Sequence, residues 1–146
     1  MLKSVFSRVM NWIGYTLFFS CLPIIILFML AVIFKYDFTL ANIANLYITD
    51  CALAVVVWRD AIILRDIIGN KVPYVSFVQY LMIWACILSS TFFSALSITQ
   101  GADLSLAPEI TKHLQYAAVS LLCAIATLGI ATQIYIGISV EPHDEE

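Results

Sequence analysis

Four long apolar stretches divide this chain, and they constrain its fold more than any other feature. They cover residues 12–34, 41–58, 74–98 and 114–138. Each holds about 18 to 25 residues, and a helix needs roughly 20 residues to cross a hydrocarbon core of ~30 Å. Lipid offers no partner to open backbone groups, so each stretch must be helical. The sequence therefore predicts an all-α membrane protein, a four-transmembrane-helix bundle that forms one domain over residues 1–146.

The overall composition agrees with lipid as the solvent. Hydrophobic residues make up 62% of the 146 residues and charged residues 12%, whereas soluble domains hold about 45–50% and about 25% respectively. The first stretch is about twice as long as the apolar part of a signal peptide, so we expect it to remain as a spanning helix. The few basic residues are scattered, which argues against nucleic-acid binding.

The distribution of basic residues sets the expected orientation. One side of the membrane would carry Lys3, Arg8, Arg59, Arg65 and Lys71, and the other Lys35 and Lys112. Lys and Arg are enriched in short cytoplasmic loops. Both chain ends and the middle loop are therefore predicted to lie in the cytoplasm, which makes the bundle N-in/C-in.

The polar segment after the second stretch is expected to extend the second helix into the cytoplasm. Gly69 and Asn70 are a typical helix end, and Pro73 can open the third helix. The segment's charged residues form a candidate docking surface for a cytoplasmic partner: Arg59, Asp60, Arg65, Asp66 and Lys71. They could equally form a solvated helix end with its own ion pairs.

Asp50 is the most unusual residue, because it lies near the middle of the second stretch. An acid at that depth costs roughly 2.5–3.5 kcal/mol on insertion scales, so it should face protein or water. With Asn45 and Thr49 it forms a candidate intramembrane polar site. This site could hold an ion or proton or join two subunits, or it could be a protonated carboxyl hydrogen-bonded inside the bundle.

Small side chains recur at helical spacing in the last two stretches. The stripes predicted to pack helices closely are Ser90, Ser94 and Ser97 in the third stretch, and Ser120, Ala124, Thr127 and Ala131 in the fourth. Small residues let membrane helices approach one another. Gly129, Gln133 and Gly137 form a second stripe in the fourth stretch, for which packing is also the favoured role.

No motif in the sequence indicates catalysis. Neither histidine, His113 or His143, lies in an apolar stretch, so a buried serine would have no base. The four cysteines are spread one to each stretch and form no close pair, which is unlike a zinc or iron–sulfur site. We therefore expect a protein that is not an enzyme and binds no cofactor or metal.

In size and layout the chain resembles several bacterial four-span proteins, namely colicin immunity proteins, phage-exclusion membrane proteins and the membrane subunit of the Kiwa anti-phage system. The resemblance is one of architecture and transfers no site. It implies a bacterial protein that works through assembly and partners rather than catalysis. The small-residue stripes, the buried acid and the lack of catalytic groups lead us to expect an inner-membrane protein that forms homo-oligomers. It would act as a sensor or pore-forming effector (a channel) with a cytoplasmic partner, in antiviral or bacteriocin defence. The alternatives are a small transporter or ion-coupled subunit that uses Asp50, and an assembly factor of a larger membrane complex.

Overall fold

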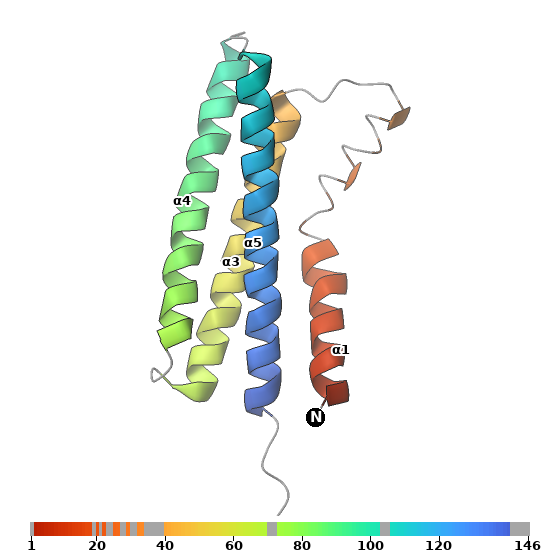
Figure 1. Cartoon of the computed structure of the whole chain (residues 1–146), viewed down its shortest axis with the longest axis vertical. Helices are drawn as coiled ribbons and strands as arrows, with labels where there is room; N and C mark the ends of the chain where they lie inside the picture. Colours follow the sequence, from red (N-terminus) through yellow and green to blue (C-terminus); the bar gives the residue numbers. More distant parts are fainter. Residues whose placement is uncertain are drawn as a thin grey trace, which may run out of the picture.

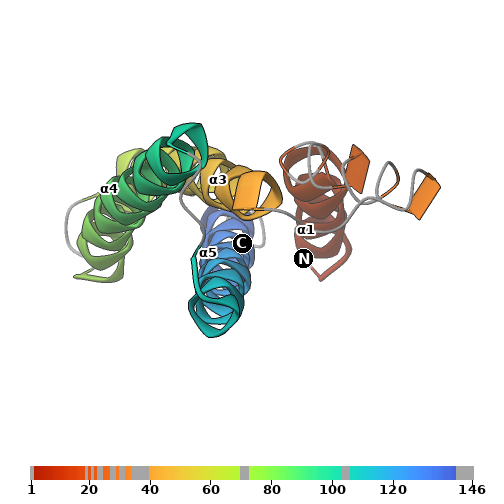
Figure 2. The same ribbon diagram turned by 90° about the horizontal axis from the view of Figure 1, so that it is seen from above.

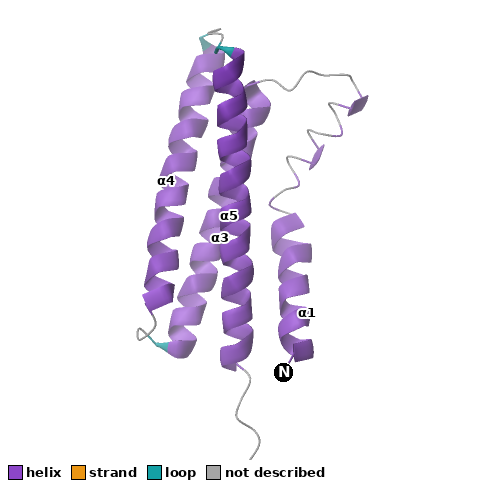
Figure 3. Ribbon diagram, viewed as in Figure 1, coloured by secondary structure: helices purple, strands orange, loops and turns teal. Residues whose placement is uncertain are grey.

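The computed structural model describes residues 2–18, 20, 22, 25–26, 29, 32–33, 40–69, 73–102 and 106–140. Every element in these ranges is helical, and they contain no strand (Figure 3). The elements are α1 (Leu2–Trp12), the π-helical turn η1 (Ile13–Leu17), α3 (Leu40–Ile68), α4 (Pro73–Gly101) and α5 (Pro108–Val140) (Figure 1). The predicted all-α class is thus confirmed. Most of the predicted first span after residue 18 lies outside the described residues.

The ends of the long helices follow local sequence signals. Helix α3 continues to Ile68, as expected, and stops at Gly69, whose φ is 73°. Glycine tolerates this left-handed conformation, and its N–H donates to the carbonyl of Arg65 at 2.8 Å, which satisfies one of the last carbonyls. Helices α4 and α5 each begin at a proline, where the missing N–H has no partner to lose.

Helix α3 is the centre of the bundle, and α4 and α5 pack on two of its sides while touching each other little (Figure 2). Helices α3 and α5 run in parallel, because Tyr47 bonds Leu114 near one end and Asp60 bonds Gln133 near the other. Helix α4 is antiparallel to both. An apolar core that includes Leu53, Val57, Met82, Ala85 and Ile125 lies between the three helices, and six polar or charged residues of the described ranges are buried with it.

Helix α1 begins at Leu2, well before the start of the predicted first span at residue 12. Residues 3–8 mix polar and apolar side chains, and the helix they form is amphipathic rather than uniformly apolar. Its inner face packs antiparallel on α5, where Val5 lies over Gly137 and Trp12 over Gly129. The first span is predicted from its long run of apolar residues, and an amphipathic helix contains no such run.

Two helices, α4 and α5, are long and apolar enough to cross a membrane. In their most apolar windows only 22% and 33% of the residues are buried within the chain, so they are unlike the core helices of a soluble protein. Large apolar side chains such as Phe77, Trp84 and Ile98 are mostly exposed on α4. Contiguous apolar surface of this kind is found where lipid or another protein covers it.

Candidate functional site

A buried carboxylate, Asp60, links three helices near the end of the bundle where the chain starts. Its side chain lies on α3 and only 2% of the residue is exposed. Trp12 Nε1 from α1 and Gln133 Nε2 from α5 each donate to Asp60 Oδ2 at 2.8 Å. Arg59 donates to Oδ1 from Nη2 at 3.0 Å and from Nε at 3.3 Å. The carboxylate is therefore well satisfied by hydrogen bonds from residues of three helices.

Gly129 makes this cluster sterically possible. A Cβ at position 129 would lie 2.4 Å from the indole ring of Trp12 and 2.9 Å from Val57. The missing side chain therefore leaves room for the tryptophan between α3 and α5. One helical turn further along α5 from Gly129, Gln133 supplies its hydrogen bond to Asp60. The predicted packing stripe of Gly129, Gln133 and Gly137 is thus the surface that receives α1.

The buried position of Asp60 corrects one prediction. Asp60 was expected on an exposed docking surface, yet it faces Trp12 and Gln133 inside the bundle, because its carboxylate needs those donors. Arg59, in contrast, has a side chain that is 64% exposed. Arg65 and Asp66 are accessible and form an ion pair at 3.7 Å. Lys71 lies outside the described residues.

Asp50 contrasts with Asp60, because it is fully buried and both of its carboxyl oxygens lack a hydrogen-bond partner among the described residues. The hydroxyl of Thr49 donates to the backbone carbonyl of Asn45 at 2.9 Å. The two polar neighbours expected from the sequence therefore do not solvate the acid. Tyr47, one turn earlier, donates its hydroxyl to the carbonyl of Leu114 at 3.0 Å.

Ser89 of α4 is a second buried polar group at the level of Asp50, and sequence reasoning did not single it out. Its hydroxyl is fully buried and has no partner among the described residues. The next residues along the two helices, Cys51 and Ser90, contact each other at 3.5 Å between Sγ and Oγ. Asp50 and Ser89 therefore share one layer of the α3–α4 interface. A carboxyl and a hydroxyl can together hold a proton, a water molecule or a cation.

The predicted small-residue stripes mostly face away from the core of the chain. Ser90, Ser94 and Ser97 on α4 are exposed, as are Ser120, Ala124 and Thr127 on α5, while Ala131 is half-buried. Ser94 and Thr127 donate to the carbonyls of Ser90 and Cys123 at 2.8 Å. Their hydroxyls thus need no water. Within one chain these stripes do not form the main interfaces of α3 with α4 and α5.

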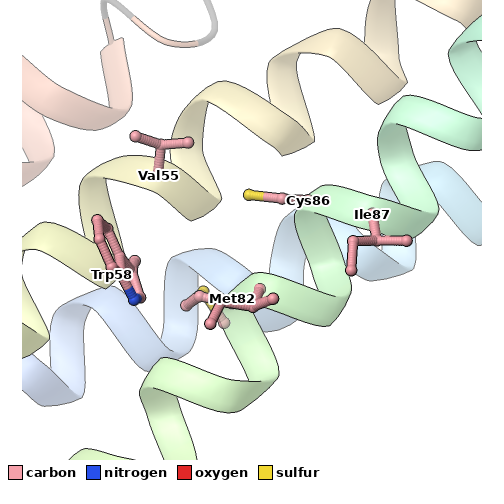
Figure 4. Close-up of a pocket in the computed structure, with 6 residues that line it drawn as sticks. Val55, Trp58, Met82, Cys86 and Ile87 are labelled. Atoms are coloured by element: carbon pink, nitrogen blue, oxygen red, sulfur yellow. The ribbon is translucent and has the colours of Figure 1, made fainter.

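An apolar groove of about 240 Å³ runs between α3 and α4 (Figure 4). It is lined by Val55, Trp58, Met82, Ile83, Cys86 and Ile87. Figure 4 shows the thiol of Cys86 pointing towards α3, where it donates to the carbonyl of Cys51 at 3.7 Å. No charged side chain lines this groove, so it offers no acid–base chemistry.

The described cysteines Cys51, Cys86 and Cys123 are free thiols. In the described part of the chain, no three side chains of the His, Cys, Asp and Glu types gather in a way that could hold a metal ion. Cys21 lies outside it.

Comparison of this chain with known protein families, with characterised proteins and with solved structures finds no match.

Proposed function

We propose that this chain is an integral protein of a bacterial inner membrane that crosses the bilayer four times and self-associates. It works as a membrane sensor or pore-forming effector with a cytoplasmic partner, in phage or bacteriocin defence, and not as an enzyme. The outward-facing stripes of small residues on α4 and α5 are the observation that carries this proposal. Both helices have the length and hydropathy to cross a membrane.

The chemistry of the stripes favours protein over lipid as their neighbour. Membrane helices associate mainly through close packing, and Gly, Ala, Ser and Thr allow the backbones to approach. Apart from Ser90, which contacts Cys51 of α3, the stripe side chains are exposed or half-buried within one chain, so they can meet a second copy. The hydroxyls of Ser94 and Thr127 bond their own helix, which lets these two side chains enter a dry interface without an unsatisfied group.

The cytoplasmic face would carry the partner site. Arg8, Arg59 and Arg65 lie towards the same end of the bundle, where α1 begins and α3 ends, and cytoplasmic loops are rich in basic residues. Since Asp60 is buried, the proposed docking surface consists of Arg59, Arg65, Asp66 and the residues that follow.

The test is the mass of the detergent-solubilised protein and of two stripe variants, Ser94→Leu and Ala124→Leu. Self-association through the stripes predicts a multiple of the chain mass for the native protein and a lower mass for one or both variants. Val119→Leu, an exposed position on α5 outside the stripe, is the matched control and should keep the native mass. A native protein that is monomeric in mild detergent would contradict the proposal.

A second candidate is a transporter or ion-coupled subunit, and the unpaired groups of Asp50 and Ser89 favour it. An intramembrane acid without a protein partner is a functional site by default. In liposomes, Asp50→Asn should abolish proton- or ion-dependent flux while the assembly persists. If the same substitution dissolves the oligomer instead, Asp50 is a structural residue and this candidate fails.

A further inference from the structure

A second cavity, of about 350 Å³, opens between α1, α3 and α5 at the end of the bundle where the chain starts. It is a mixed surface, unlike the apolar groove of Figure 4. Its polar lining is Arg8, Arg59, Asp60 and Gln133, and its apolar lining is Trp12, Ile63 and Ile136. Two guanidinium groups and several apolar side chains therefore line the same cavity.

The charges in this cavity are not balanced. Asp60 already accepts hydrogen bonds from Trp12, Gln133 and Arg59, so its oxygens have little capacity left. Arg59 directs Nε and Nη2 to Asp60, its guanidinium bonds no other described residue, and its side chain is 64% exposed. Arg8 is exposed, and no described carboxylate forms an ion pair with it. Two guanidinium groups against one carboxylate leave the cavity with one excess positive charge.

We propose that this cavity binds the phosphate of an anionic phospholipid, with Arg8 and Arg59 as the phosphate ligands. Guanidinium groups match phosphate oxygens in geometry and charge, and basic pockets between helices at the cytoplasmic surface bind such headgroups. The inference rests on the membrane embedding in the proposed function, but it does not require self-association.

The apolar lining identifies the ligand as a lipid rather than a soluble phosphate. Ile63 is 44% exposed and adds apolar surface beside the two guanidinium groups, which a lipid can cover and a soluble phosphate cannot. Trp12 lines the same cavity and is 6% exposed, so its fluorescence reports on a lipid bound there. Because Arg8 and Trp12 belong to α1, a lipid bound in the cavity would also help to hold α1 against α3 and α5.

Quenching of Trp12 by brominated lipids tests this proposal in the full-length protein. Trp58→Phe and Trp84→Phe leave Trp12 as the only tryptophan of the chain. The protein is placed in phosphatidylcholine vesicles that contain a minor fraction of either brominated phosphatidylglycerol or brominated phosphatidylcholine. The cavity predicts stronger quenching by the anionic lipid, and a loss of this preference in the double variant Arg8→Gln/Arg59→Gln.

Arg65→Gln is the matched control, because Arg65 lies on the same helix outside the cavity and should leave the preference intact. Equal quenching by both lipids in the native background would overturn the proposal, as would loss of the preference in the Arg65 control. Inorganic phosphate in large excess should not remove the preference; if it does, the cavity is a phosphate site and not a lipid site. The mass of the native protein and of the double variant in detergent is measured in parallel. This measurement shows whether the chain self-associates, independently of whether the cavity binds lipid.

Discussion

Two acids on helix α3, Asp50 and Asp60, are both buried but have opposite surroundings. Asp60 accepts hydrogen bonds from Trp12, Gln133 and Arg59, whereas Asp50 has no partner among the described residues. They lie ten residues apart, which is about 15 Å along a helix and half of a ~30 Å hydrocarbon core. With Asp60 at the cytoplasmic interface, Asp50 would lie near the middle of the bilayer.

The difference between the two acids separates a structural role from a functional one. A buried polar group is costly unless it is hydrogen-bonded. For Asp60 this cost is offset, because its hydrogen bonds with Trp12 and Gln133 hold α1 and α5 against α3. Asp50 makes no hydrogen bond to a described residue, and neither does the hydroxyl of Ser89, so this layer is where the second candidate function would place an ion or a proton.

The largest expected effect is that of Asp60→Ala. The substitution leaves two buried donors, on Trp12 and Gln133, without an acceptor, and each such group costs about 1–3 kcal/mol. We expect a clear fall in the thermal unfolding temperature in detergent and a red shift of Trp12 fluorescence as α1 leaves the bundle. Asp66→Ala removes an exposed acid from the same helix and should change stability by about 0.5 kcal/mol or less. Equal effects of the two variants would contradict the anchoring role.

A smaller effect is expected from Gly129→Ala. The new methyl group would lie 2.4 Å from the ring of Trp12, and overpacking of this kind costs about 1–3 kcal/mol. Gly137→Ala is the matched control on the same stripe, because its nearest contact, Val5 Cγ2, would be 3.0 Å from the new Cβ, a milder clash than 2.4 Å. The free energy of unfolding in detergent should fall more for Gly129→Ala than for Gly137→Ala. A larger fall for Gly137→Ala would show that Trp12 of α1 does not pack against Gly129.

The smallest expected effect on stability is that of Asp50→Asn. The carboxyl loses no hydrogen bond to a described residue, so the free energy of unfolding should change by about 1 kcal/mol or less. Asp60→Asn, the same substitution ten residues later, should cost more, because an amide offers one acceptor oxygen in place of two. If Asp50→Asn lowers the free energy of unfolding more than Asp60→Asn does, Asp50 is a structural residue and the two acids do not differ in the way described.

Much of the fold could be predicted from the sequence because its signals are local. Gly69 ends α3, and prolines begin α4 and α5, as the rules for helix ends predict. The stripe of Gly129 and Gly137 was also predictable, since small residues at helical spacing indicate close packing. Apolar length alone could not reveal α1, whose residues 2–11 are amphipathic.

The Asp60 cluster could not be predicted, because it joins residues that are far apart in the chain. Next to Arg59, Asp60 resembles one half of a local surface ion pair. Only the fold brings Trp12 and Gln133 to it, across sequence separations of 48 and 73 residues. Ser89 was missed for the same reason, since its register with Asp50 depends on how α4 lies against α3.

Cysteine labelling of intact cells tests most directly the claim that lipid solvates these helices and leaves Asp50 at mid-depth. In a chain without its native cysteines, Glu109→Cys should react with a membrane-impermeant reagent added from outside. Asp66→Cys should react only after the membrane is permeabilised. Labelling of both positions, or of Asp66→Cys alone, in intact cells would contradict the account.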